Sequence, residues 1–483
     1  MPTRVYKLSI AVLLAACGPQ SVGSLDEPAS STTDAPASDG AATFMATADD
    51  PANLGVTTGQ SSDDPSTGTT TDTTTGAGGC EDCSALQVSA GANFTCAVVT
   101  GGRVRCWGFG DYGALGLAST ERIGDDELPS SAPDVDVGGA VAEVAAGGYG
   151  SGVCARLVDG AVRCWGYDQT FTGILGQMNQ ATIGDDESPA DVPPIDLGGP
   201  ATQLSFGGHA CALLRGGAVR CWGSNDAGRL GYGHTEDIGD DETPASAGDV
   251  DVGDTVLALA VGGTHTCALL PAGRVRCWGI GQDGQLGHGN LDPLGPPELS
   301  WIGDDETPAA MGDVPVGGTV VQLAAGMFHT CALLDTGGVR CWGANTFGAL
   351  GHNLTHHDDI GDDETPASMG DVPIGAPAIQ VAAGGSHSCA LLTTGAVRCW
   401  GDNSYGQLGL GHTQSLTAAQ APDIDLGGLA TAIHISSDQS CAVLVDGTLR
   451  CWGRNFWGEL GQGHTEDIGD DETPAQAGPI PFL

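Results

Sequence analysis

One fifteen-residue stretch, present in seven related copies, limits what this chain can fold into. Its fifth copy runs from His329 to Gly343 and reads His-Thr-Cys-Ala-Leu-Leu-Asp-Thr-Gly-Gly-Val-Arg-Cys-Trp-Gly. Two short runs of strand-forming residues flank a glycine-containing turn, a pattern that predicts a β-hairpin. From Cys106 to Cys451 the second cysteine of the stretch recurs over six intervals, with a mean period of 57.5 residues. Repeats of this length are typical of solenoids, arrays and propellers.

The hairpin register predicts where the two cysteines of each copy lie. If the loop comprises residues 335–337, Leu333 faces Val339 and Cys331 faces Cys341 across the two strands. The Cβ atoms of directly opposed residues lie roughly 4.5–5.5 Å apart, which is near the reach of a disulfide. Both faces of the hairpin carry apolar bulk, as expected for strands that are covered on both sides.

Residues 1–17 predict an export leader. Arg4 and Lys7 precede a short apolar run over residues 8–16, which is too short to span a bilayer and fits a signal peptide. The run ends in Leu-Ala-Ala-Cys, which resembles a bacterial lipobox and implies cleavage before Cys17 and lipidation of its thiol. An ordinary secretory signal is the alternative. An aspartate after the cysteine often marks inner-membrane lipoproteins, so Gly18 favours the outer membrane or cell surface.

Residues 18–79 predict a disordered stalk. They are mostly Ser, Thr, Ala, Gly, Pro and Asp, a composition that cannot bury enough apolar area to offset the entropy lost on ordering. Cys80 and Cys83 follow, where the stalk meets the repeats, and predict a small structural disulfide. A redox role needs a βαβ context, and a zinc site needs a second pair of ligands nearby.

Export implies an oxidising compartment, in which paired cysteines form disulfides. We therefore expect each repeat to link a cysteine to the one ten positions further on. Free core thiols are one alternative, and zinc bound by a His-x-Cys pattern is another, although the histidine is present in only four copies. The predicted pairs are Cys96–Cys106, Cys154–Cys164, Cys211–Cys221, Cys267–Cys277, Cys331–Cys341, Cys389–Cys399 and Cys441–Cys451.

Residues 80–483 read as seven units of four strands each, without helical periodicity. In the fifth unit an apolar strand over residues 319–325 precedes the hairpin, and a short fourth strand is expected around residues 371–374. The last residues, 479–483, are expected to complete the first unit and close a ring. The sequence therefore predicts an all-β repeat domain.

The repeats resemble a known family. Their common pattern is Gly-x-x-His-(Ser/Thr), a strand, a glycine turn and Trp-Gly-x-Asn-x-x-Gly-x-Leu-Gly, as in residues 400–409, and it is weaker in unit two, where residues 165–176 carry two extra residues. This pattern is similar to the regulator of chromosome condensation repeat. The resemblance implies a seven-bladed β-propeller of four-stranded antiparallel blades. A cysteine pair in every unit, with arginine before the second cysteine, departs from the usual family pattern.

Four histidines recur two positions before the first cysteine of a unit, at His209, His265, His329 and His387. No serine, cysteine or carboxylate keeps a fixed spacing to them that would complete a catalytic triad. The resemblance implies a structural histidine near the corner of a blade.

An acidic motif, Ile-Gly-Asp-Asp-Glu, starts at positions 123, 183, 238, 302, 360 and 468, and unit six has Ala418-Ala419-Gln420 instead. Three interpretations compete. The motif is a solvated connector whose first aspartate caps a turn, or it pairs with the repeated arginines, in which case Arg398 of unit six lacks a partner. Calcium is the third, because hard cations take several carboxylate oxygens. The candidate calcium ligands are Asp240, Asp241, Glu242, Asp362, Asp363 and Glu364.

Trp301 is a candidate partner contact, because it lies in the longest connector and outside the Cys-Trp pattern. Exposed aromatic side chains on loops anchor binding partners. Packing of Trp301 on a neighbouring blade is the alternative.

The charge balance limits which classes of partner the chain can bind. With 60 acidic and 16 basic residues, the net charge of −44 repels phosphate backbones and anionic lipids, so nucleic acid is excluded as a partner. We predict a non-enzymatic binding propeller without a cofactor, a monomer that meets the membrane only through its lipid anchor and recognises a protein or glycan. The family resemblance implies an exchange factor for a small GTPase as one alternative, which export and charge disfavour. A propeller hydrolase or lyase is the other, but no catalytic constellation is visible.

Overall fold

The computed structural model describes residues 84–148, 151–168, 172–178, 182–289, 301–354 and 358–482. Cys17, the stalk and the Cys80–Cys83 pair lie outside these ranges, as does the boundary expected between residues 79 and 80. The predictions for them therefore stay predictions.

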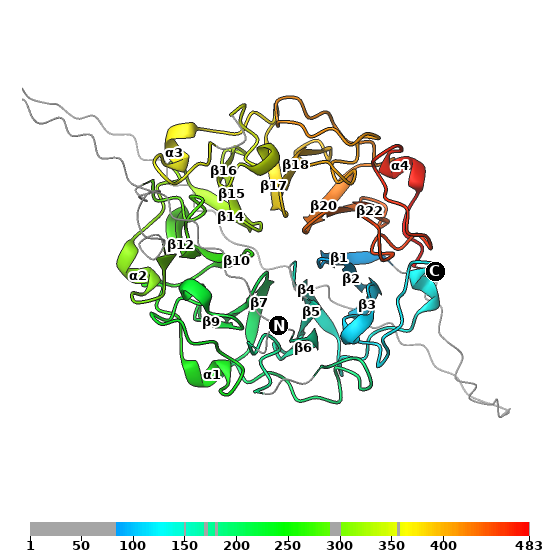
Figure 1. Ribbon diagram of the computed structural model, residues 1–483, viewed down its shortest axis with the longest axis horizontal. Helices are drawn as coiled ribbons and strands as arrows, with labels where there is room; N and C mark the ends of the chain where they lie inside the picture. Colours follow the sequence, from blue (N-terminus) through cyan, green and yellow to red (C-terminus); the bar gives the residue numbers. More distant parts are fainter. Residues whose placement is uncertain are drawn as a thin grey trace, which may run out of the picture. The chain divides into compact units, whose positions relative to one another are not determined.

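The described strands form seven antiparallel sheets arranged in a ring, with consecutive sheets side by side (Figure 1). In the described ranges six sheets contain three strands and one contains four, in sequence order from the centre outward. We call them blades one to seven along the chain. Since each blade is one of the seven repeats, the sequence period and the ring of blades agree.

The strands fall into three classes. The inner strands are β1 (Ala85–Ala90), β4 (Val141–Ala146), β7 (Ala201–Phe206), β10 (Ala258–Val261), β14 (Val320–Ala325), β17 (Ala378–Ala383) and β20 (Ala430–Ile435). The middle strands are β2 (Phe94–Val99), β5 (Ser151–Leu157), β8 (Ala210–Leu214), β11 (His265–Leu270), β15 (His329–Leu334), β18 (His387–Leu392) and β21 (Gln439–Leu444). The third strands are β3 (Arg103–Gly108), β6 (Val162–Tyr167), β9 (Val219–Trp222), β12 (Arg274–Ile280), β16 (Val339–Gly343), β19 (Val397–Gly401) and β22 (Leu449–Gly453).

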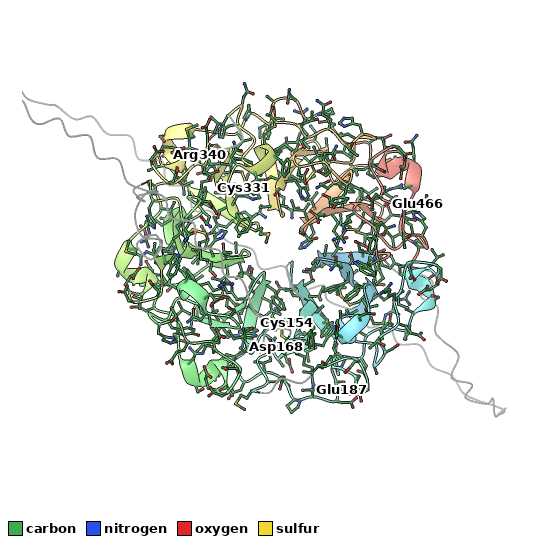
Figure 2. The ribbon with its side chains drawn as sticks, viewed as in Figure 1. Cys154, Asp168, Glu187, Cys331, Arg340 and Glu466 are labelled. Atoms are coloured by element: carbon green, nitrogen blue, oxygen red, sulfur yellow. A yellow bond between two sulfur atoms is a disulfide. The ribbon has the colours of Figure 1, made fainter. Side chains whose placement is uncertain are left out.

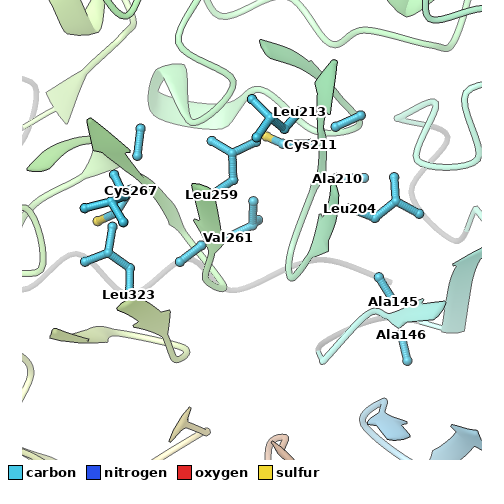
Figure 3. Close-up of a cluster of buried hydrophobic side chains, with 14 of the residues drawn as sticks. Ala145, Ala146, Leu204, Ala210, Cys211, Leu213, Leu259, Val261, Cys267 and Leu323 are labelled. Atoms are coloured by element: carbon cyan, nitrogen blue, oxygen red, sulfur yellow. The ribbon is translucent and has the colours of Figure 1, made fainter. Parts of the chain in front are cut away.

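The core lies between the blades. Middle strands such as β15 are buried at every residue, because another blade covers each of their faces. Figure 3 shows this packing between neighbouring blades, with Leu204 on β7 and Leu259 on β10 among the buried side chains. Each blade also buries the tryptophan that follows its second cysteine, for example Trp342 with no exposed surface. Packing between blades therefore explains why both strand faces are apolar.

The predicted hairpin register is confirmed. Leu333 pairs with Val339, and Cys331 pairs with Cys341. Gly337 has φ of +82°, a left-handed conformation that a glycine adopts at little cost and that closes the turn. Each of the seven blades carries a disulfide between cysteines ten positions apart, as predicted.

The predicted fourth strand is wrong in position and in length. Beyond β16, Ile360 of the acidic motif forms a single bridge with Gly343, and Val372 donates one hydrogen bond to Val339 at the other end. The two contacts flank the third strand without forming a continuous ladder. Blade four alone, among the described residues, extends this bridge into a strand, β13 (Trp301–Ile302). In blade five the remainder of the acidic motif and helix α3 (Pro366–Met369) lie between these two contacts in the sequence.

Short helices, which the sequence analysis did not predict, follow the acidic motif. Proline occupies their first turn, where its missing N–H leaves no helical bond unmade, and a preceding threonine is the N-cap. They are α1 (Pro244–Ala247), α2 (Pro308–Met311), α3 (Pro366–Met369) and α4 (Pro474–Ala477). Single 3-10 turns are η1 (Asp111–Gly113), η2 (Pro129–Ser131), η3 (Asp226–Gly228), η4 (Pro271–Gly273) and η6 (Thr346–Gly348). No helix in the described ranges is both long and apolar enough to cross a membrane.

Ring closure differs from the expectation that residues 479–483 complete the first blade. Ile480 donates its N–H to Leu449 on β22, so the C-terminal segment belongs to blade seven. The closure is made by backbone hydrogen bonds, such as the one from the Ala85 N–H to the Gly447 carbonyl, and by side chains. The ring of Phe482 packs edge-on against Trp107 of blade one at 5.7 Å between centroids. Gln439 donates to the Gly91 carbonyl across the same seam. Each blade is thus one continuous piece of chain.

Candidate functional site

A cavity of about 240 Å³ lies on the axis of the ring, lined by the inner strands of all seven blades. Its polar groups are used mainly to join blades. The Gln87 side chain both donates to the Val144 carbonyl (2.9 Å) and accepts from the Val144 N–H (2.8 Å) of the next blade. His434 also lines the cavity, and burial lowers its pKa to about 4, so it is neutral at pH 7.

The four repeated histidines form joints between neighbouring blades. His329 of blade five lies 2.9 Å from the Ser388 hydroxyl of blade six, measured from Nε2 to Oγ. Ser388 donates its single proton to the Ala349 carbonyl, so His329 Nε2 is the donor to Ser388. Burial lowers the pKa of His329 to about 3, which keeps the ring neutral. The other three joints are His209–Thr266, His265–Thr330 and His387–Ser440.

The two side chains that face each other at a joint are matched in polarity. Where the histidine position holds Gln439, the next blade again supplies a hydroxyl, from Thr95. Where that position holds Phe94, the next blade supplies Val153, and both are buried. Each hydrogen-bonding side chain therefore faces a partner that can bond it. An unpaired buried polar group would cost about 1–3 kcal/mol.

The repeated tryptophan strengthens the same joints. Trp400 of blade six donates its indole N–H to the Ala349 carbonyl of blade five, the acceptor that Ser388 also uses. Trp452 of blade seven likewise donates its indole N–H to the Gln407 carbonyl of blade six. The histidines, hydroxyls and tryptophans thus form a structural network, in agreement with the structural role expected for the histidines.

The repeated arginines do not pair with the acidic motif, so that interpretation is wrong. Arg340 pairs with Asp371 (3.0 Å), and Arg398 pairs with Asp423 (2.6 Å), two aspartates that lie beyond the motif. Arg398 belongs to blade six, the blade expected to leave its arginine without a partner. In five blades the partner is an aspartate further along the repeat, whereas Arg163 and Arg450 donate to backbone carbonyls.

The acidic motifs form compact triads at the rim of the ring, where Figure 2 labels Glu187. Within a triad one carboxylate oxygen from each residue lies within 4.8 Å of the other two. Burial first, and then the hydrogen bond to Asp363 and the charge of Asp362, raise the pKa of Glu364 to about 8. The same causes raise the pKa of Glu127, Glu242, Glu306 and Glu472 to about 7. The triads are thus sites of electrostatic repulsion, and calcium binding there remains a prediction.

Trp301 lies on β13, half-buried, where it pairs with Ile280 of the same blade. Its indole nitrogen is buried. This placement favours the packing alternative for Trp301 over the exposed loop contact, although its role in binding stays a prediction.

A band of aromatic side chains crosses four blades on the face where the third strands end. Tyr112 stacks on Tyr167 with 4.6 Å between ring centroids. Phe109 lies 5.1 Å from Trp457, which contacts Phe456 at 4.6 Å. Arginines link the rings. The Arg122 guanidinium lies 4.2 Å from the Trp457 ring, and that of Arg454 lies 5.9 Å from both Tyr405 and Phe456. We call these six rings, Tyr405, Phe456, Trp457, Phe109, Tyr112 and Tyr167, the aromatic band.

The aromatic band is accessible. Phe456 is 60% exposed, Tyr112 is 51% exposed and Tyr405 is 41% exposed, whereas most large apolar side chains of the repeats are buried. The backbone of Tyr112 has φ of +60°, which is unusual for a bulky residue. An aligned view of the Trp-Gly connectors would have found the band, because Tyr112, Tyr405 and Trp457 occupy the same position of the repeat.

Comparison with known proteins agrees with the sequence pattern. A family model described as RCC1-like domain matches residues 124–481, and one described as regulator of chromosome condensation (RCC1) repeat matches residues 86–114. The ultraviolet-B receptor UVR8 of Arabidopsis thaliana is 27% identical over 386 residues, which cover 79% of this chain and 80% of the receptor. The E3 ubiquitin-protein ligase HERC2 of Mus musculus is 27% identical over 64% of this chain, but the match covers only 6% of HERC2.

Solved structures share the fold. Prp20p from Saccharomyces cerevisiae superimposes with a TM-score of 0.61 at 21% identity, over 82% of this chain and 87% of that one. Human WBSCR16 gives a TM-score of 0.59 at 22% identity, over 77% of this chain and 93% of that one. These likenesses show the fold. The family model over residues 124–481 covers more than half of the chain, so the chain belongs to the RCC1-like domain family.

Proposed function

We propose that this protein is a non-enzymatic binding propeller that presents the aromatic band to a partner. The band itself is the observation that carries the proposal. Tryptophan, tyrosine and arginine are the residues enriched at the energetic centres of protein interfaces. Here they form one contiguous surface that stays exposed, at Phe456 and Tyr112 above all.

The use of the histidines supports binding over catalysis. A general base needs a pKa near the working pH and access to a substrate. His265 and His387 are fully buried, and burial lowers the pKa of each to about 3. Their Nε2 atoms bond hydroxyls of the neighbouring blade. The candidates that most resembled catalytic groups therefore act in the joints.

Attachment to the cell surface is part of the proposal. The leader over residues 1–17 and the lipobox-like sequence before Cys17 support export and lipidation, and residues 18–79 have the composition of a stalk. A Cys17→Ser variant is expected to lose labelling by a fatty-acid analogue and to appear in the medium or periplasm. Unchanged membrane fractionation of Cys17→Ser would contradict the anchor.

The binding role is tested with the soluble Cys17→Ser chain as bait for envelope and secreted proteins. A second bait adds Tyr112→Ala and Phe456→Ala, and a control adds Phe347→Ala, which removes a 45% exposed ring at the repeat position of Tyr112 but outside the band. We expect a partner that the first and third baits retain and the second loses. Equal capture by all three would contradict a role for the band. Substrate turnover abolished by a single substitution would contradict the non-enzymatic reading.

A further inference from the structure

We propose that the aromatic band and the acidic triads beside it bind a basic, lysine- or arginine-rich segment of a partner protein. This inference rests on the proposed binding function and adds the chemistry of the partner. The proposal concerns blades six, seven, one and two, where rings and triads meet in succession.

The turns that carry Tyr405, Trp457 and Tyr112 each pack directly against the acidic motif of the next blade. The glycine after Tyr405 packs on the next blade so closely that a Cβ there would lie 2.4 Å from the Asp470 nitrogen. The glycine after Trp457 has the same relation to Asp125, also at 2.4 Å, and the glycine after Tyr112 to Asp185 at 2.5 Å. Turns with aromatic residues and acidic motifs thus alternate around this part of the ring.

The chemistry of the band suits cations. Aromatic faces attract guanidinium and ammonium groups within about 6 Å of the ring centroid. Arg122 lies 4.2 Å from Trp457, so the band already accepts a guanidinium from its own chain. Tyr112, Tyr405 and Phe456 keep much of their surface free for further contacts. A basic side chain on these rings would reach the neighbouring carboxylates with its charged end.

Charge supports the same partner. The net charge of −44 attracts cationic partners and speeds their approach. Within a triad three carboxyl groups repel one another, and burial with this repulsion raises the pKa of Glu127 and Glu472 to about 7. A partner's ammonium or guanidinium group would relieve that repulsion. A neutral glycan would stack on the rings but leave the triads uncompensated.

Other blades lack either the aromatic ring or the triad and therefore serve as internal comparisons. Blade five carries Phe347 at the ring position, but blade six has Ala418 and Ala419 where the triad would be. Blades three and four have Ala227 and Asp283 at the ring position, so the triads that follow them lack an aromatic neighbour. Among the described turns, an aromatic residue at the ring position is followed by a triad on the next blade at three consecutive boundaries, between blades six and seven, seven and one, and one and two.

The test uses the soluble Cys17→Ser chain and three fluorescent twelve-residue peptides, one alternating lysine and serine, one alternating glutamate and serine, and one of glycine and serine. Binding is measured by anisotropy at 0.15 M salt. The double variant Tyr112→Ala and Phe456→Ala leaves the net charge unchanged. We expect it to bind the lysine peptide about tenfold more weakly, since truncation of an interface anchor costs more than about 1 kcal/mol. Phe347→Ala is expected to change affinity less than twofold.

A second pair of variants tests the triads. Asp125→Asn with Asp126→Asn is expected to weaken binding of the lysine peptide severalfold, whereas Asp304→Asn with Asp305→Asn, which removes the same charge in blade four beside Ala227, is expected to change it little. Equal effects of the two pairs would overturn the proposal, because they would indicate unspecific attraction by the net charge. Thermal melts check that each variant is folded.

Other ligands of the aromatic band would give results that differ from those expected for a basic segment. Binding of a glycan array that depends on Tyr112 and Phe456, or a concentration-dependent dimer in sedimentation that these changes abolish, would overturn the basic partner but leave the proposed binding function intact. If the captured partner requires the band and presents an acidic or uncharged surface there, the basic partner is likewise overturned. Failure of every ligand and partner to depend on the band would overturn both proposals.

Discussion

The joint between blades five and six can be tested by replacing its hydroxyl. Ser388→Val removes the group that accepts from His329 and donates to the Ala349 carbonyl. The replacement is one the chain uses elsewhere, because blades one and two have Phe94 and Val153 at the equivalent positions, both buried in one core cluster. Phe94 also packs over Gly91 as His329 packs over Gly326, so a phenylalanine fits at this position.

The expected loss follows from the bonds removed. A hydrogen bond contributes about 0.5–1.5 kcal/mol net, and a buried N–H left without an acceptor costs about 1–3 kcal/mol. Trp400 still donates to the Ala349 carbonyl, so the main loss is the unpaired Nε2–H of His329. We expect Ser388→Val to lower the free energy of unfolding by about 2–4 kcal/mol. His329→Phe combined with Ser388→Val restores an apolar pair, and we expect it to recover at least about 1 kcal/mol of that loss.

The free energies come from urea unfolding followed by tryptophan fluorescence, without reductant so that the disulfides stay intact. Ser368→Val on the exposed helix α3 is the matched control and is expected to change stability by less than about 0.5 kcal/mol. If Ser388→Val behaves like this control, or if the two single changes add without coupling in the double variant, the joint does not act as described.

Three further outcomes follow from the structure. Replacing Cys331 and Cys341 by alanine is expected to cost about 2–3 kcal/mol, since a ten-residue loop is released in the unfolded chain; unchanged urea midpoints would contradict this. Raising the pH from 6.5 to 8 is expected to lower the melting temperature, because the folded pKa of Glu364 is raised to about 8 and its favourable protonation is lost there; Glu364→Gln should raise the melting temperature at pH 8 and have little effect at pH 5. Below pH 6.5 the lowered pKa of His329 reverses the sign, and stability falls as the pH approaches about 3. If the triads bind calcium, chelation at pH 8 lowers the melting temperature, whereas an unchanged value argues against binding.

The sequence was sufficient for the hairpins because their register depends on local chemistry. A glycine turn and two facing cysteines place Cys331 opposite Cys341 without any knowledge of the rest of the molecule. The number of blades follows from counting repeats. These features need only information that lies within one repeat.

Contacts between repeats were harder to predict. Arg340 could reach either of two acidic segments, and only the three-dimensional arrangement shows that Asp371 is its partner. The fourth strand was misplaced for the same reason, because the motif around Ile360 and the segment around Val372 both approach the third strand. The aromatic band was missed because its residues come from four repeats and become neighbours only when the ring closes.

The continuity of each blade has a consequence for how such a protein can change over time. Since no blade in the described part of the chain is assembled from both of its ends, a repeat can be duplicated, deleted or moved within the gene as one unit. The joints restrict that freedom, because His329 needs a hydroxyl on whichever blade follows, and Phe94 needs an apolar neighbour. The side chains at the joints therefore restrict which blade can follow which, because the backbone of the blades alone would allow many orders around the ring.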